Sequence, residues 1–220
     1  MPETNPHVFG GNIAAVIIGI IVLIYIFKVW KQNKNPIDFA TFVLVSALLL
    51  IRFFRALDDL FGMFEIDITP YLSVQYLSIF DVLYMIYGVV FGWFILFIYG
   101  FKRSYTLPYV AGFFLEMYIM VTDNRVPHNV FVTLIVLAAS GILLVNAIKN
   151  HSGISFSIVL GAVIGVLEFY IEVWWLTFAL PFIVFIVLYT GVNGWWDEHV
   201  FYDRNKRKEI QNSWISKVVK

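Results

Sequence analysis

Long runs of apolar residues, separated by short polar segments, form the dominant pattern along this chain. Within each run the apolar residues continue without the period-two alternation that a half-buried β-strand shows. A run of about 20 apolar residues crosses a hydrocarbon layer of about 30 Å when it is helical. The pattern therefore predicts an all-α, polytopic membrane helix bundle with seven transmembrane helices. The expected spans are Asn12–Trp30, Phe39–Phe54, Ile79–Phe101, Ser104–Thr122, His128–Ala147, Gly153–Ile171 and Trp175–Asn193.

The division between the sixth and seventh spans is the least marked, because only Glu172–Trp174 separate two apolar runs. A six-span alternative would fuse this region or insert it half-way into the membrane. The third apolar stretch, Leu72–Phe101, is longer than a bilayer requires. We therefore expect this stretch to tilt or to project beyond the outer surface.

Composition supports a membrane protein and excludes an ordinary soluble domain. Charged residues make up 14% of the chain, against roughly 25% in soluble domains. The absence of cysteine excludes disulfides, thiolate catalysis and cysteine-ligated metals. We expect three parts: an outer N-terminal tail at 1–11, a seven-helix transmembrane domain at 12–196 and a basic amphipathic inner tail at 197–220.

Basic and acidic residues are distributed unequally between the two sides of the predicted bundle. With seven spans, twelve of the fifteen basic residues fall on the side that holds the odd-numbered loops and the C-terminal tail. Ten of the fifteen acidic residues fall on the other half. Because cytoplasmic loops are enriched in Lys and Arg, the N-terminus is predicted outside and the C-terminus inside. We interpret the chain as a multi-pass protein of the plasma (cytoplasmic) membrane.

Two further segments are predicted to lie on the membrane surface. Arg52–Phe61 continues the second span with mixed charges and aromatic residues, which suits the outer interface. Arg207–Val219 spaces apolar residues at helical intervals among lysines, so it is expected to rest on anionic lipid of the inner leaflet, the alternative being a solvated tail. The expected partners are therefore the bilayer, this anionic lipid, and a membrane protein or a second copy of the chain. No nucleic acid is expected.

Carboxylates inside or near the spans are the most function-like feature of the sequence. Glu116 lies outward of the middle of the fourth span, and Glu168 lies in the last turn of the sixth. A charge near the bilayer centre costs at least about 2.5 kcal/mol, so such residues are functional candidates. The candidate solute- or cation-binding residues, all in the outer third of the bilayer, are Glu116, Glu168, Asp81, Arg52, Glu172 and Arg55.

We expect these residues to form one polar cluster in which Arg52 or Arg55 faces Glu116, Glu168 and Asp81. Since the carboxylates outnumber the arginines, at least one should be protonated, bound to a cation or open to external water. The alternatives are a structural ion pair for Glu116 and Glu168, and a solvated rim position for Asp81 and Glu172. The two arginines could also extend to the outer lipid headgroups.

A short internal similarity supports treating Glu116 and Glu168 alike. The segments 115–121 (LEMYIMV) and 167–173 (LEFYIEV) match at five of seven positions. This match would make spans four–five and six–seven parallel repeats, as in some transporters. The alternative is a chance match in an apolar alphabet.

Several chemistries are excluded by the positions of basic and histidine residues. No lysine lies at mid-depth, which excludes a retinal Schiff base, and the four histidines form no pair at helical spacing for haem or di-iron. The motifs HExxH and GxSxG and a phosphate-binding loop do not occur. We expect no catalytic residues, no cofactor and no metal site. Asn146 and Ser140 are expected to form hydrogen bonds across the bundle.

These features favour a non-enzymatic membrane protein with an outward-facing acidic pocket that binds or transports a small solute or cation. The first alternative is a sensor or an accessory subunit of a larger membrane complex. The second alternative is a lipid-modifying enzyme that uses the outer carboxylates as acid and base. The sequence leaves the identity of the solute and the oligomeric state open.

Overall fold

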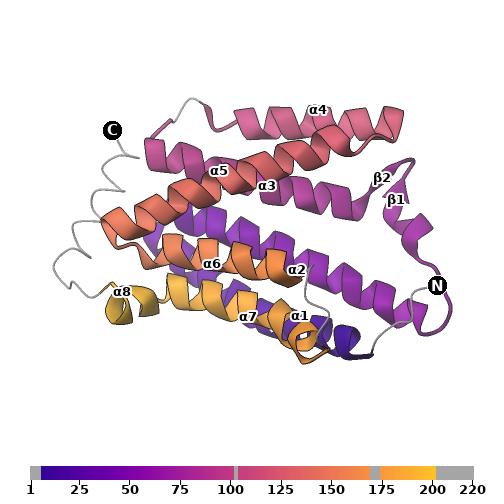
Figure 1. Cartoon of the computed structure of the whole chain (residues 1–220), viewed down its shortest axis with the longest axis horizontal. Coiled ribbons are helices and arrows are strands. Elements are labelled where there is room, and N and C mark those ends of the chain that lie inside the picture. The colour runs from indigo at the N-terminus through magenta and orange to yellow at the C-terminus, as the bar shows by residue number, and fades with distance from the viewer. Residues whose placement is uncertain (1–5, 102–103, 169–173, 202–220) are drawn as a thin grey trace.

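The computed structural model describes residues 6–101, 104–168 and 174–201, and eight α-helices and one short hairpin form this part of the chain (Figure 1). The elements are α1 (Pro6–Asn33), α2 (Pro36–Gly62), the 3-10 helix η1 (Thr69–Leu72), β1 (Ser73–Val74), β2 (Leu77–Ser78), α3 (Ile79–Tyr99), α4 (Leu107–Thr122), α5 (Val126–Asn150), α6 (Gly153–Glu168), α7 (Trp174–Val192) and α8 (Trp195–His199). The prediction of an all-α membrane helix bundle is confirmed at this level.

Local capping groups fix where the helices around the site begin and end. The Asn35 side chain accepts a hydrogen bond from the Ile37 N–H, and Pro36 opens α2. Ser78 and Asp81 form a capping box that starts α3 directly after the hairpin. Gly100 ends α3 with a φ of 72°, a left-handed conformation that glycine adopts without strain.

Six of the helices form a closed ring in which each packs against its two neighbours, in the order α1, α2, α3, α5, α6, α7 and back to α1. Helix α4 lies outside this ring, against α3 and α5, and forms the upper layer in Figure 1. We call the end of the bundle that carries β1 and β2 the hairpin end, and the opposite end the α8 end.

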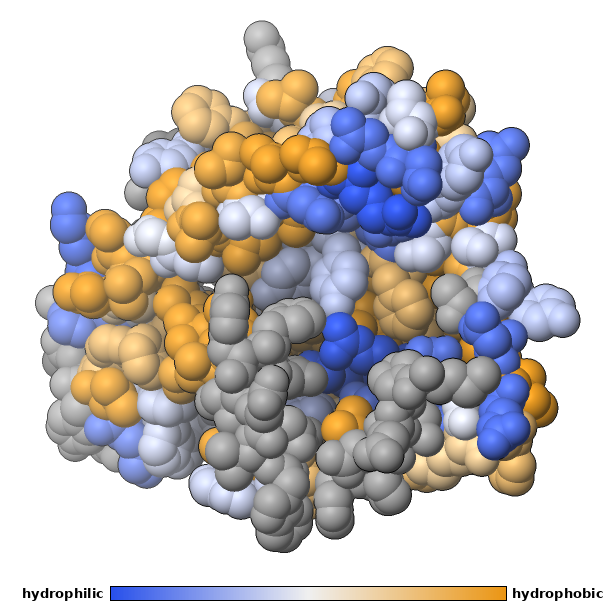
Figure 2. Space-filling view, turned by 45° about the vertical axis from the view of Figure 1, so that its right-hand side comes forward, coloured by the Kyte–Doolittle hydropathy of each residue, from blue (hydrophilic) through white to orange (hydrophobic). Residues whose placement is uncertain are grey.

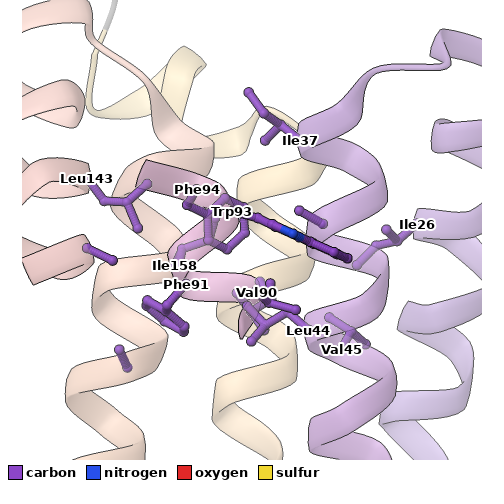
Figure 3. Packing of buried hydrophobic residues seen from close by; sticks show 14 of the residues in the cluster. Ile26, Ile37, Leu44, Val45, Val90, Phe91, Trp93, Phe94, Leu143 and Ile158 are labelled. Carbon is purple, nitrogen blue, oxygen red and sulfur yellow. The ribbon is translucent and has the colours of Figure 1, made fainter. Parts of the chain in front are cut away.

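Apolar side chains from all six ring helices fill the centre of the ring. Phe91 and Phe94 of α3 are almost completely buried, and Leu143 and Ile158 lie close to them (Figure 3). Each such side chain gains about 1.5–3 kcal/mol when an apolar protein interior replaces water. In a bilayer the same packing instead contributes dispersion energy, since lipid is equally apolar.

The chain is an integral membrane protein, because four of its helices are long and apolar enough to cross a membrane. These four are Val8–Asn33, Pro36–Gly62, Ile79–Tyr99 and Val126–Asn150, while α4, α6 and α7 are apolar but shorter. The structure divides the region of the sixth and seventh predicted spans into the separate helices α6 and α7. The seven-span count and the orientation stay predictions.

The apolar stretch that begins at Leu72 is not helical throughout, because residues 73–78 form the hairpin and α3 begins only at Ile79. Arg52–Phe61 continues the second predicted span as the last part of α2, and Arg52 and Ala56 are buried there. The predicted amphipathic tail at 207–219 lies outside the described residues.

Candidate functional site

Three helices bring ionisable side chains together at the hairpin end. Asp81 lies in the first turn of α3, Glu116 in the second half of α4, and His128 in the first turn of α5. In Figure 2 the hairpin end faces the viewer, and hydrophilic residues gather there between apolar surfaces. The starts of α3 and α5 and the second half of α4 therefore place acidic and histidine side chains at one level of the bundle.

The Asp81 carboxylate makes its contacts through one oxygen. Its Oδ2 atom accepts a hydrogen bond from the Ser78 N–H at 2.9 Å and lies 3.3 Å from Nε of Arg125. Arg125 also pairs with Asp123 at 3.0 Å and donates to the carbonyl oxygen of Tyr76 in the hairpin. One guanidinium thus ties the hairpin, α3 and the α4–α5 turn together.

His128 is buried, with only 2% of its side chain exposed. Its Nε2 atom lies 3.2 Å from the Asp81 carbonyl oxygen, and its Nδ1 atom lies 3.0 Å from Oδ1 of Asn129. Both neighbours are oxygen acceptors, so the imidazole is the donor in either contact, and the tautomer decides which nitrogen carries the hydrogen. The distance from Nε2 to Oε1 of Glu116 is 3.9 Å, which is too long for a hydrogen bond.

Glu116 consequently has no donor. Only 14% of its side chain is exposed, and within the described part of the chain neither carboxylate oxygen has a hydrogen-bond partner. The ionisable groups nearest to it are the His128 imidazole and the Asp81 carboxylate, which pairs with Arg125. A buried carboxylate that accepts no hydrogen bond favours a ligand that supplies positive charge and N–H groups.

A pocket of about 210 Å³ extends from Glu116 along the groove between α3 and α4. Val43 of α2 contributes to its wall, and among the described residues Glu116 is its only charged lining side chain. The remaining lining is apolar or aromatic: Val82, Met85, Ile86, Val89, Val90, Trp93, Tyr109, Gly112 and Phe113. An apolar pocket with one precisely placed polar group is typical of a small-molecule site.

Glycines allow α4 to approach α3 beside this pocket. A Cβ atom at Gly92 would lie 3.0 Å from Pro108, and a Cβ atom at Gly112 would lie 3.0 Å from Met85. At the far end of the pocket the Trp93 N–H donates to the Tyr105 carbonyl oxygen at 3.0 Å. The Trp93 and Tyr109 rings form an edge-on pair with centroids 4.9 Å apart.

Among the candidate residues whose side chains the structure describes, Asp81 and Glu116 lie together near His128. Arg55 donates a hydrogen bond to the Tyr84 hydroxyl group at 2.8 Å. Arg52 is a buried residue of α2, with 7% exposure. Glu168 ends α6, but its side chain and the whole of Glu172 lie outside the described residues.

Sequence reasoning missed the two residues that organise this site, Arg125 and His128. In the sequence Arg125 stands out only as a charged residue of a loop, although it pairs with Asp81. A search for two histidines at helical spacing on one helix does not find His128, which lies on α5, contacts α3 and approaches α4. The available signal was that His128, Asp81 and Glu116 are predicted at similar depth.

A second polar cluster lies at the α8 end and is closed. Asn146 of α5 donates to the Ser155 hydroxyl group of α6 at 2.8 Å and accepts from Asn150 at 2.6 Å. Ser152 donates to Ser155 at 3.1 Å. Asn146 therefore forms the bond across the bundle that was expected of it.

The described residues contain no group of three or more His, Cys, Asp or Glu side chains that could hold a metal ion. Comparison with protein-family models, with curated proteins and with solved structures found no match.

Proposed function

We propose that this protein is a seven-span membrane protein that binds a small solute in the pocket between α3 and α4, with Glu116 as its principal ligand. The N-terminus lies outside and the C-terminus inside, so the hairpin end faces the exterior. The observation that carries the proposal is the buried Glu116 carboxylate, which borders the pocket and has no hydrogen-bond donor among the described residues.

Binding fits the geometry better than passage through the middle of the bundle. Apolar side chains fill the centre of the ring, whereas the pocket lies at its side, between α3 and the outer helix α4. A lateral pocket with one charged end can hold and orient a solute. Within this proposal, Asp81 and Arg125 set the local charge, and His128 positions the start of α5 through its bond to Asp81.

A ligand panel tests the binding function. Purified protein is screened by thermal stabilisation against cationic, neutral and anionic small solutes, beside the variant Glu116→Gln. We expect at least one solute to stabilise the wild type and to lose its effect in Glu116→Gln. The matched control is Asp58→Asn, which removes a carboxylate of α2 that is exposed and does not line the pocket. Equal responses of wild type and Glu116→Gln to every solute would overturn the proposal.

The orientation has its own test, helped by the absence of native cysteine. Tyr71 is exposed at the hairpin end, and Lys149 is exposed in the last turn of α5 at the α8 end. We expect a membrane-impermeant maleimide to label Tyr71→Cys in intact cells and Lys149→Cys only after permeabilisation. The reverse result would invert the proposed topology.

A further inference from the structure

We infer that the solute is a compact hydrophobic monoamine, with one protonated amino group on an apolar body of about eight non-hydrogen atoms. This inference rests on the proposed function and names the chemical class that the Glu116 pocket takes. It depends on four properties of the described residues: the unpaired carboxylate, the apolar lining, the size of the pocket and the position of its opening.

The charge of the ligand follows from the donors around Glu116. The two ring nitrogens of His128 face oxygens of Asn129 and Asp81, and Arg125 is engaged by Asp81, Asp123 and Tyr76. No described group is left to donate to Glu116. An ammonium group supplies both the positive charge and up to three N–H donors.

The remaining lining limits the ligand to one polar group. From Val82 to Trp93 on α3 and from Tyr109 to Phe113 on α4, the pocket offers apolar side chains and aromatic rings. A second hydroxyl, amide or charge on the ligand would lose its water without gaining a partner. Sugars and zwitterions are therefore disfavoured. A hard metal cation would need about six oxygen ligands, and the pocket has one carboxylate.

The size of the pocket sets the size of the apolar body. A cavity of about 150 Å³ with an apolar lining holds one benzene molecule, which has six heavy atoms. The pocket of about 210 Å³ is about 1.4 times larger, which corresponds to about eight or nine heavy atoms by the same packing. A long alkyl chain would not fit within it.

The shape of the pocket determines how the ligand is oriented within it. Glu116 and Tyr109 are seven residues apart on α4, which corresponds to about 10 Å along the helix axis. The amino group then lies at Glu116 near the hairpin end, and the apolar body extends toward the Trp93–Tyr109 pair. Gly112 lies between the two ends and leaves space where a side chain would otherwise project.

The opening lies on the outer surface of the bundle, so the ligand reaches it from the lipid. Val82, Tyr109 and Phe113 line the pocket and are all exposed. A hydrophobic amine first partitions into the bilayer, where its ammonium group stays at the interface and its body points inward. That is the orientation which the pocket accepts.

The test measures binding of 2-phenylethylammonium to the full chain in lipid nanodiscs, with empty nanodiscs as the control for partitioning. We expect saturable binding of one molecule per chain and an affinity about tenfold to a hundredfold lower in Glu116→Gln, the usual effect of losing a charged hydrogen bond. The uncharged 2-phenylethanol should bind more weakly than the amine by a similar factor, and methylammonium should not bind.

Two further variants distinguish loss of the binding site from loss of the fold. Asp58→Asn should bind 2-phenylethylammonium like the wild type. Val82→Phe adds volume at the exposed rim of the pocket, near Glu116, and should weaken binding without altering the buried core.

The outcomes separate this inference from the proposed function. Equal binding of the amine and 2-phenylethanol, or equal amine binding by wild type and Glu116→Gln, would overturn the inference. If 3-phenylpropionate or a polar solute binds in a Glu116-dependent way and the amine does not, the monoamine assignment is wrong and the binding function stands. If no solute shows Glu116-dependent binding, both are wrong.

Discussion

The two polar clusters of this bundle differ in how completely their atoms are paired. At the α8 end Asn146, Asn150, Ser152 and Ser155 satisfy one another through uncharged hydrogen bonds. At the hairpin end Asp81, Arg125 and His128 are also paired, but Glu116 beside them is not. A buried polar atom without a partner costs about 1–3 kcal/mol, so the first cluster stabilises the bundle while Glu116 destabilises it.

The helices that carry the two clusters also differ in their place in the bundle. Asn146 and Ser155 lie on α5 and α6, which are neighbours in the closed ring. Glu116 lies on α4, outside the ring, where only Pro108, Gly112 and Ile119 are buried. The polar cluster inside the ring thus supports the fold, whereas the outer helix presents a carboxylate that a ligand can satisfy.

The largest change in stability should come from disrupting the closed cluster at the α8 end. Asn146→Leu removes the bonds to Ser155, which is buried, and to Asn150, which is exposed. We expect a loss of about 2–3 kcal/mol in the free energy of unfolding, measured in mixed detergent micelles. Thr133→Leu makes a polar-to-leucine change on the exposed face of the same helix and should change stability by less than about 0.5 kcal/mol. Equal losses would show that the Asn146 bonds contribute nothing specific.

An intermediate effect is expected from the ion pair that borders the site. Arg125 is 42% exposed, so solvent screens its attraction to Asp81. We expect a coupling free energy of about 0.5–1 kcal/mol in a double-mutant cycle of Arg125→Gln and Asp81→Asn. Asparagine at 81 can still accept the Ser78 N–H, which keeps the α3 cap. The coupling should weaken in high salt, and a salt-independent value would contradict a screened surface pair.

The smallest effect on stability should come from Glu116→Gln. No hydrogen bond is lost, because no described group donates to this carboxylate, so the change should stay within about 0.5 kcal/mol of the wild type. The measurement is the same unfolding experiment, made without added ligand. A loss well above this range would mean that Glu116 and His128 form a structural ion pair, and the contrast between the two clusters would then disappear.

The positions of the helices could be predicted well from the apolar runs. The predicted starts at Ile79 and Gly153 and the predicted end at Thr122 coincide with the limits of α3, α6 and α4. The hairpin at 73–78 could not be predicted in the same way, because its residues continue the apolar pattern of α3. There the Ser78 cap decides the boundary, rather than hydrophobicity.

The depth of the ionisable residues could also be predicted, but not their neighbours. Counting along the spans places Glu116 and Asp81 at one level, and the structure brings both to the hairpin end. Which cation meets Asp81 depends on the order of helices around the ring. In a membrane the lipid-facing and core-facing residues are equally apolar, so the pattern does not show which face of α2 or α5 points inward. The pairing of Arg125 with Asp81 could therefore not be predicted.

The place of α1 in the ring has a consequence for how the protein is assembled. Its glycine-containing face packs against α7: Gly11 meets the backbone of Phe178, and Gly19 meets the ring of Phe185. More than a hundred residues separate α1 from α7 in the chain (Asn33 to Trp174). Because α7 is synthesised long after α1, the contact between them can form only late in translation. The ring is therefore closed by a long-range contact, the kind that forms slowly.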